Sequence, residues 1–251
     1  MTKVTLIPRA YGPESTHLLD IFSRRIRSLS EDLHISQLRI STNSRGHIEI
    51  TMGGDDEEFL RNVLDQRYGI VPSFEKVSID IEYSGYLVDV GQVGYGLYID
   101  IGLSPNPPTD LLIPLHRLRE QFDMPGKSLN EICRKQVLVE NLPVNTRITN
   151  IDSRKAELEG EFAESYIDRI NAWANETHQR LLIFGSTYRM IDNALSNTNH
   201  KQDVIEIERI GTFEFSVTCK LGTRATGILA AIGPRLRGIP VYPFIPKKVR
   251  G

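Results

Sequence analysis

The chain has 251 residues, of which 40% are hydrophobic and 25% are charged, and its formal net charge is −2 at pH 7. This composition is typical of a soluble globular protein with room for two or three small domains. It excludes a protein that is basic throughout and coats nucleic acid by charge alone, and no apolar run approaches the ~20 residues that a membrane span requires. Because the pattern of a signal peptide is also missing, we expect a cytoplasmic protein.

Residues 1–78 are predicted to form a first small module. Apolar residues from Leu18 to Leu33 recur at spacings of three and four, which indicates one face of a helix. The other expected elements are strands at Val4–Ile7, Leu38–Ile40 and His47–Thr51 and a helix at about Asp56–Tyr68. Asp55 and Glu58 have the spacing of a capping box at the start of that second helix. The order β-α-β-β-α, with a possible final strand, predicts a ferredoxin-like split βαβ unit.

The middle of the chain, residues 79–162, shows a different pattern. In Tyr86–Gly102, apolar and polar residues roughly alternate, and glycines occur where a strand would have to bend sharply. This predicts strands that coil around a small closed barrel, because glycine relieves crowding at barrel corners and bulges. The segments that follow are Asp110–Leu118, Arg147–Asp152 and Lys155–Glu159.

Together these segments resemble the S-one RNA-binding domain, an OB-fold repeat first seen in a small-subunit ribosomal protein. The resemblance implies a five-stranded OB-fold barrel with RNA as its ligand, and it puts Tyr95 and Tyr98 where S-one domains offer aromatic faces for base stacking. The alternative for the two tyrosines is one core residue and one rim residue. The chain departs from the family pattern near the third strand, where Pro114 and His116 stand in place of a His and, two positions later, a Ser.

Cationic side chains accompany the expected barrel. His116, Arg117 and Arg119 lie beside the third strand, and Arg154 and Lys155 lie in the turn before the last strand. If the barrel closes as in its relatives, these residues border one groove and contact phosphate. The alternative is a solvated helix face and a charged turn, since exposed Arg and Lys are common on any protein surface.

Residues 163–251 are predicted to form a third module, reached through a connecting helix at Glu161–His178. The expected elements after that helix are strand Arg180–Phe184, helix Tyr188–Ser196, strands Val204–Glu208 and Glu214–Cys219, a helix from Ala225 to Leu236, and strand Val241–Ile245. Their order, β-α-β-β-α-β, is again ferredoxin-like. The predicted fold is therefore α+β, with a central five-stranded OB-fold barrel (79–162) between two small ferredoxin-like α/β modules (1–78 and 163–251).

Three motifs extend the resemblance to the whole chain. They are Gly53–Glu57, Val93–Gly102 and Cys219–Ala230, and they keep their order over the full length. With them the chain resembles an archaeal family of proteins that is defined as a domain of unknown function. This resemblance implies relatives but no activity.

Motifs for metal or covalent chemistry are missing from the sequence. The six histidines show no paired ligand spacing, and Cys133 and Cys219 stand in no CxxC or nucleophile motif. Gly185–Thr187 and Gly222–Gly227 each join a strand to a helix, where free amides can hold phosphate, but neither matches a nucleotide-binding loop. We therefore expect no catalytic residues, no cofactor and no metal.

Charge is unevenly distributed, with −1 for residues 1–78, −4 for residues 79–160 and +3 for residues 161–251. The leading hypothesis is a non-enzymatic RNA-binding or ribonucleoprotein-associated protein, in which Tyr95 and Tyr98 stack on bases. The basic last module would add electrostatic attraction, and its tail Lys247–Arg250 is expected to be mobile. The second hypothesis is an adaptor whose tyrosines anchor another protein of the translation or transcription machinery. An enzyme that acts on a phosphorylated small molecule at Gly222–Gly227 ranks third.

Overall fold

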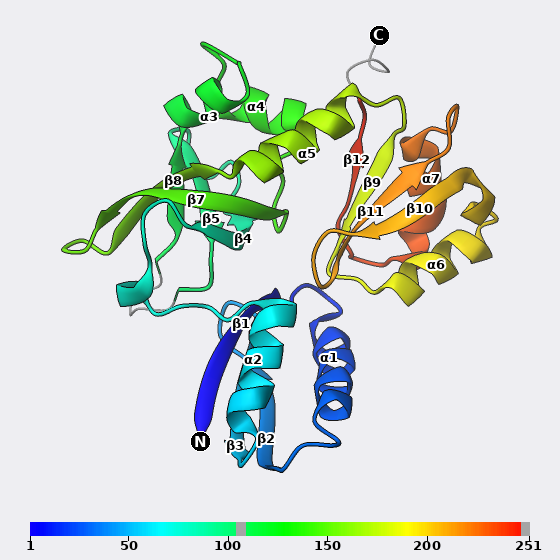
Figure 1. Ribbon diagram of the computed structural model, residues 1–251. Helices are drawn as coiled ribbons and strands as arrows, with labels where there is room; N and C mark the ends of the chain where they lie inside the picture. The colour runs from blue at the N-terminus through cyan, green and yellow to red at the C-terminus, as the bar shows by residue number, and fades with distance from the viewer. Residues whose placement is uncertain (104–108, 247–251) are drawn as a thin grey trace. The chain divides into compact units, whose positions relative to one another are not determined.

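The computed structural model describes residues 1–103 and 109–246 as a mixed α+β protein (Figure 1). The chain forms two compact units. Met1–Val71 and Gln179–Pro243 together make the first, which we call the two-segment unit. Pro72–His178, with the chain from Phe244 onward, makes the second, which we call the barrel unit. The basic tail Lys247–Arg250 lies outside the described residues.

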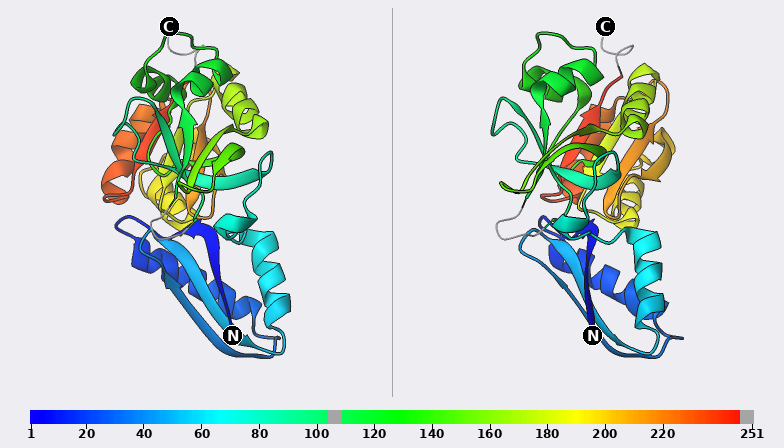
Figure 2. Two further views of the ribbon diagram at one scale, coloured as in Figure 1. Left: turned by 90° about the vertical axis from the view of Figure 1, so that its left-hand side faces the viewer. Right: turned by 60° about the vertical axis from the view of Figure 1, so that its left-hand side comes forward.

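The first segment of the two-segment unit is an antiparallel sheet with two helices against one of its faces (Figure 2). Its elements are β1 (Thr2–Arg9), α1 (Ser15–Leu29), β2 (Ile35–Thr42), β3 (His47–Gly54) and α2 (Glu57–Tyr68), with strand order β1-β3-β2. Alternate residues of β1 and β3 are buried, so one face of the sheet meets the apolar sides of both helices, including Phe22 and Leu60. The predicted order of elements is confirmed.

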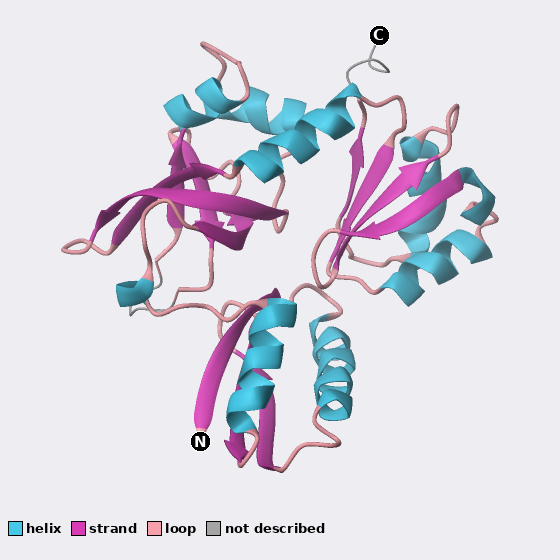
Figure 3. Ribbon diagram, in the orientation of Figure 1, coloured by secondary structure: helices cyan, strands magenta, loops and turns pink. Residues whose placement is uncertain are grey.

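The second segment of the same unit is a four-stranded sheet with helices α6 and α7 (Figure 3). Its elements are β9 (Arg180–Phe184), α6 (Tyr188–Asn197), β10 (Val204–Arg209), β11 (Glu214–Cys219), α7 (Ala225–Ile232) and β12 (Val241–Phe244), with short 3₁₀ turns at Lys201–Asp203 and Gly233–Arg235. The strand order is β10-β11-β9-β12, and the two central strands, β9 and β11, are buried along their whole length. Here too the predicted order of elements is confirmed.

The two segments share contacts at the turn before β11. Phe213 is part of the core of the first segment, where its ring centroid lies 6.4 Å from that of Phe22. Beside it, the wholly buried carboxyl of Glu214 accepts a hydrogen bond from the Tyr11 hydroxyl at 2.8 Å. The core of the first segment is therefore completed by a residue from the second.

The barrel unit contains a closed five-stranded barrel, which confirms the prediction of a small closed barrel in the middle of the chain. Its strands are β4 (Glu82–Val88), β5 (Gly96–Asp100), β6 (Leu111–Pro114), β7 (Pro143–Asp152) and β8 (Glu157–Phe162), arranged β4-β5-β6-β8-β7. Two glycines allow the close approach of strands that the sequence pattern indicates. A Cβ atom on Gly96 would lie 2.5 Å from the Ile113 carbonyl oxygen, and one on Gly85 would lie 2.6 Å from that of Asp100.

Three helices accompany the barrel, and α3 and α4 lie together at one end of it (Figure 1). They are α3 (Leu115–Gln121), α4 (Leu129–Gln136) and α5 (Glu164–Asn175), and a 3₁₀ turn at Phe74–Lys76 precedes the first strand. Ser128 and Glu131 form a capping box at the start of α4, in which each side chain accepts a hydrogen bond from the other residue's backbone N–H. Helix α5 was predicted from the sequence, α3 only as the alternative of a helix face beside the third strand, and α4 not at all.

The expected capping box at Asp55 and Glu58 is wrong. Helix α2 begins at Glu57 with Asp56 as its N-cap residue, and no side chain caps it. The Asp56 carboxylate instead accepts a hydrogen bond from the backbone N–H of His34 at 2.7 Å and contacts the His34 ring at 3.1 Å. These hydrogen bonds are the largest causes that lower the pKa of Asp56. The N-cap residue is thus one position later than the local spacing indicated, and its carboxylate bonds a residue 22 positions earlier in the chain and not the helix.

Within residues 1–103 and 109–246, none of the helices combines the length and the apolar character that crossing a bilayer would require. The Cys133 and Cys219 side chains are both buried.

Candidate functional site

Tyr95 and Tyr98 lie at the start of β5 and form a pair. Tyr95 precedes the strand and is 56% exposed, whereas Tyr98 lies within the strand and is half-buried. Their hydroxyl oxygens are 2.7 Å apart, and their rings meet edge to face with centroids 6.3 Å apart at 86°. The hydrogen bond holds both side chains in one arrangement, so that the exposed ring projects from a fixed base.

Strand register extends this pair into a row across the barrel. Tyr98 on β5 is the cross-strand partner of Leu112 on β6, and Leu112 is in turn the partner of Glu159 on β8. Side chains at paired positions project from the same face of a sheet. An aromatic, an aliphatic and an acidic side chain therefore stand next to one another on one face, although 61 positions of sequence separate Tyr98 from Glu159.

A pocket of about 480 Å³ opens on this face, and we call it the tyrosine pocket. It is lined by Tyr95, Tyr98, Thr109, Asp110, Leu112, Lys155, Ala156, Glu157, Leu158 and Glu159. The volume lies within the range of small-ligand sites in proteins. Its wall thus combines two aromatic rings, aliphatic surface, one cation and three carboxylates.

The tyrosine pocket has an excess of negative charge, because three carboxylates oppose one cation. The hydrogen bond with Tyr95 is the main cause that raises the pKa of Tyr98 to about 12, with further contributions from burial and from the charges of Asp110 and Glu157. Tyr98 is therefore neutral at physiological pH. Carboxylates accept hydrogen bonds from the exocyclic amino groups of bases but repel phosphate. The pocket therefore favours hydrogen-bond donors and cationic groups over anionic ones.

The six candidate residues from the sequence fall into two groups. Tyr95, Tyr98 and Lys155 line the tyrosine pocket together. Arg154 is exposed in the turn between β7 and β8, next to Lys155, but does not line the pocket. The backbone N–H groups of both turn residues point to the Asp152 carboxylate, at 3.0 and 3.3 Å, which fixes the shape of the turn.

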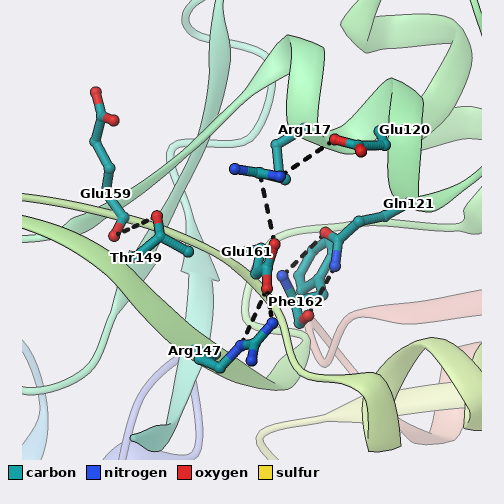
Figure 4. Close-up of polar contacts among 8 residues, drawn as sticks. All are labelled: Arg117, Glu120, Gln121, Arg147, Thr149, Glu159, Glu161 and Phe162. Atoms are coloured by element: carbon teal, nitrogen blue, oxygen red, sulfur yellow. Dashed lines mark hydrogen bonds and ion pairs between the residues drawn. The ribbon is translucent and has the colours of Figure 1, made fainter. Parts of the chain in front are cut away.

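His116 and Arg117 lie on helix α3, which matches the alternative of a helix face, and neither lines the tyrosine pocket. Figure 4 shows the Arg117 guanidinium between two carboxylates, Glu120 at 3.2 Å and Glu161 at 3.5 Å. Glu161 also pairs with Arg147 on β7. The charge of Arg117 is thus shared within an ion-pair network that ties α3 to β7 and β8.

A second set of contacts fixes α3 against the barrel. The Gln121 side chain donates to the Phe162 carbonyl oxygen at 2.8 Å and accepts from the Phe162 N–H at 3.1 Å (Figure 4). This amide pairing imitates one step of a strand ladder and completes the edge of β8. Helix α3 therefore has a clear role in closing the end of the barrel.

Four residues of the pocket were not predicted as members of the site from the sequence, namely Asp110, Leu112, Glu157 and Glu159. Each of them lies in or next to a predicted strand, so the sequence indicated their segments but not that these segments meet. What was missing was the parallel pairing of β6 with β8, which brings Leu112 next to Glu159. Parallel pairs are joined by long connections, and local patterns carry no information about their register.

The other sites that the sequence raised have structural explanations. At Gly222–Gly227, the backbone N–H of Ala225 donates to the Gln179 side chain at 2.8 Å, so one amide at the start of α7 already has a partner. Thr187 caps α6 by accepting from the Met190 N–H at 3.3 Å. Among the described residues, no three His, Cys, Asp or Glu side chains converge in a way that could hold a metal ion.

Comparisons with solved structures give distant similarity only. The chain is similar to the solution structure of GSP13 from Bacillus subtilis, with 16% identity, a TM-score of 0.26, and coverage of 35% of this chain and 56% of that one. It is also similar to the intact alpha subunit of aIF2 from Pyrococcus abyssi, with 8% identity, a TM-score of 0.26, and coverage of 69% and 99%. The chain therefore spans little more than half the length of GSP13. No curated protein matches the sequence.

Family comparison covers nearly the whole chain. Residues 3–73 match the DUF2110 N-terminal domain, residues 77–174 the DUF2110 central domain, and residues 178–241 the DUF2110 C-terminal domain. The three matches follow one another in the order of the family's own domains, and the protein belongs to the DUF2110 family.

Proposed function

We propose that the protein is a non-enzymatic RNA-binding protein that uses an OB-type barrel, with the tyrosine pocket as the site for bases. One observation carries the proposal: Tyr95, Tyr98, Leu112 and Lys155 meet in a single pocket. Aromatic faces beside a cation are what proteins use to hold single-stranded nucleic acid, because bases stack on the rings while the cation meets the backbone.

The topology of the barrel supports the OB assignment. The strand order β4-β5-β6-β8-β7, with β6 and β8 parallel and the other pairs antiparallel, agrees with a five-stranded Greek-key barrel. OB-folds bind oligonucleotides on their second and third strands and on the loops before the second and before the fifth strand. Here those parts are β5, β6, residues 89–95 and residues 153–156, and the pocket draws residues from each.

The flanking sheets support the ferredoxin-like part of the fold in the same way. The order β10-β11-β9-β12 is that of a β-α-β-β-α-β unit in which the first and third strands are central. The order β1-β3-β2 is the same unit without its fourth strand, and the edge that this strand would occupy is bordered by the bridge from Leu6 to Ile70.

The test is a titration of fluorescent single-stranded RNA with the full-length protein at several salt concentrations. We expect Tyr95→Ala/Tyr98→Ala to weaken binding at least about tenfold, since each stacked base contributes ~1–3 kcal/mol. Phe59→Ala serves as the matched control, because Phe59 is an aromatic residue on α2 with 58% exposure. RNA affinity that is the same in the double variant and in wild type would refute the proposal.

A second candidate function rests on the charge of the pocket. Asp110, Glu157 and Glu159 oppose the single cation Lys155, which would suit a basic segment of another protein with the tyrosines as anchors. An adaptor of this kind would retain its partner from cell extract after nuclease treatment and would lose it in the Tyr95→Ala/Tyr98→Ala variant. Retention that depends on intact RNA would count against it.

A further inference from the structure

A second concave surface lies in the two-segment unit and has the opposite charge. We call it the arginine groove: it has a volume of about 650 Å³ and is lined by His17, Ile21, Arg24, Arg25, Thr187, Tyr188, Arg189, Met190, Asn193, Arg209, Thr212 and Phe213. Four arginines and a histidine face it, and none of these lining residues is a carboxylate. The arginines come from α1, α6 and the end of β10, so elements far apart in the sequence build this surface.

The charges of the arginine groove are only partly neutralised within the protein. Arg24 pairs with Asp20 at 2.8 Å. Arg25 and Arg189 are exposed and form no ion pair with any described residue. Asp20 beside Arg24 and Glu214 beside Arg209 are fewer carboxylates than the four arginines would need for neutrality. The remaining positive charge favours a bound anion.

Arg209 is held in place and close to a like charge. Its guanidinium donates to the Thr212 carbonyl oxygen at 2.5 Å and lies 4.9 Å from the centroid of the Phe215 ring. Burial is the main cause that lowers the pKa of Arg209, the charge of Arg25 lowers it further, and Glu214 and Tyr68 act in the opposite direction. Arg209 and Arg25 are thus close enough to repel each other, and an anion bound beside them would reduce that repulsion.

Two further features of the arginine groove point to a polynucleotide. Thr187 and Tyr188 are at the start of α6, where the Thr187 hydroxyl caps the Met190 N–H and the helix dipole still favours an anion nearby. The Tyr188 side chain is 50% exposed beside the arginines and offers a face for a base. Small ligands are mostly enclosed by their sites. Here the cations and the Tyr188 ring lie at the surface, where a strand of RNA can extend past them on both sides.

We propose that the arginine groove is a second RNA site, which binds the phosphate backbone of a single strand while the tyrosine pocket takes bases. This assignment rests on the proposed function in that RNA is the shared ligand. The two surfaces would bind different parts of the RNA, because the pocket offers aromatic rings and carboxylates to the bases whereas the groove offers cations to the phosphates. This assignment also explains how an RNA-binding protein can have an acidic barrel.

The experiment compares two double variants of the full-length protein in RNA titrations over a range of salt. Arg25→Ala/Arg189→Ala removes two exposed arginines of the groove. Arg27→Ala/Arg134→Ala removes two exposed arginines elsewhere and is the charge-matched control. Loss of two phosphate contacts to a single strand should reduce the slope of log affinity against log salt by about 1.4 and weaken low-salt binding about tenfold. The control variant should have a salt slope and a low-salt affinity close to those of wild type.

The outcomes separate this proposal from that of the tyrosine pocket. If the groove variant behaves like its charge-matched control, the groove is not an RNA site, whatever Tyr95→Ala/Tyr98→Ala does. If Tyr95→Ala/Tyr98→Ala keeps the RNA affinity of wild type and the groove variant does not, the tyrosine pocket is not an RNA site and the arginine groove is. Inorganic tripolyphosphate tests whether the groove binds a small anion and not RNA. The RNA assignment is overturned if tripolyphosphate raises the unfolding temperature of wild type but not of the groove variant, and if both proteins bind RNA equally well.

Discussion

The Tyr11 hydroxyl donates a 2.8 Å hydrogen bond to the carboxyl of Glu214, a residue 203 positions further along the chain. The same carboxyl accepts from the Phe213 N–H at 3.1 Å and has no exposed surface. Burial is the main cause that raises the pKa of Glu214 to about 7, against an ordinary value of 4.5. The hydrogen bonds and the charges of Arg9 and Arg209 act in the opposite direction.

This contact predicts a pH dependence of stability. Well below pH 4.5, Glu214 is protonated in both the folded and the unfolded protein, so its titration does not lower the free energy of unfolding. As the pH rises from 4.5 to about 7, the unfolded state ionises first, and the free energy of unfolding falls until both states are ionised. Glu214→Gln cannot ionise, so its stability relative to wild type should increase across this window and stay constant above it.

Urea unfolding at several pH values measures the effect of Glu214. Tyr11→Phe is a useful companion variant, because it removes a hydrogen bond that lowers the pKa and should extend the decline above pH 7. Parallel curves for wild type and Glu214→Gln between pH 4.5 and 7 would show that the carboxyl is not buried in solution.

The tyrosine pocket predicts that the Tyr95 ring matters for RNA and its hydroxyl does not. Tyr95→Phe should bind single-stranded RNA within about threefold of wild type, whereas Tyr95→Leu should lose about tenfold, because a base stacks on an aromatic face and not on an aliphatic one. Fluorescence anisotropy distinguishes the two variants. Equal losses in both would assign the effect to the hydrogen bond with Tyr98 instead.

The carboxylates of the same pocket should limit RNA affinity. Glu157→Gln/Glu159→Gln removes two negative charges and should strengthen RNA binding about threefold to tenfold at low salt, with the gain fading above ~0.1 M as charges are screened. The control is Glu31→Gln/Asp32→Asn, an exposed acidic pair in the other unit. Weaker binding in the pocket variant would mean that these carboxylates accept hydrogen bonds from the bases.

Gly96 predicts a steric limit at the base of the tyrosine pair. In Gly96→Ala, the new Cβ would lie 2.5 Å from the Ile113 carbonyl oxygen and 2.7 Å from a methyl carbon of Leu112, so β5 and β6 would have to separate. We expect a loss of about 1–3 kcal/mol in the free energy of unfolding. Gly94→Ala, where a Cβ meets nothing within 4 Å, should change little. Urea unfolding of both variants measures the difference.

The capping box of α4 predicts a local stability effect. Ser128→Ala removes the hydroxyl that accepts from the Glu131 N–H at 3.3 Å and should cost about 1 kcal/mol. The Ser128 N–H, Lys127 and the Ser128 hydroxyl hold the pKa of Glu131 at about 2, so its contribution is complete above pH 4.5 and is lost as the pH falls toward 2. Unfolding at neutral pH should therefore show the full loss. A Ser128→Ala variant as stable as wild type would indicate that α4 is fixed by its apolar side alone.

Local patterns predicted elements well where an element buries a regular stripe. The spacing of Leu18, Phe22 and Ile26 predicted α1, and all three residues are fully buried. Short helices fared differently. Helix α3 has 7 residues and follows Pro114 directly, so the end of a strand and the start of a helix share one apolar run. The signature Ser128–Glu131 was present in the sequence and could have revealed α4.

The candidate site was predictable only as far as single segments reach. Tyr95 and Tyr98 are three positions apart, so the sequence alone placed them in one short segment, and they meet because Tyr95 lies just before β5 and Tyr98 within it. Their acidic neighbours Glu157 and Glu159 depend on the register of β8 beside β6, which is fixed by the closed barrel and not by either segment. The arginine groove depends even more on tertiary structure, since Arg25 and Arg209 come from the two segments of the two-segment unit and no local pattern connects them.

The division of the chain into units has a consequence for biosynthesis. Residues 72–178 leave the ribosome before Gln179–Pro243, so the barrel can close on the nascent chain while the two-segment unit is still half made. Until Phe213 emerges, the core around Phe22 lacks one of its members and presents apolar surface. The first segment to be translated is therefore among the last to be completed, and a ribosome that stalls after the barrel would display it unfinished.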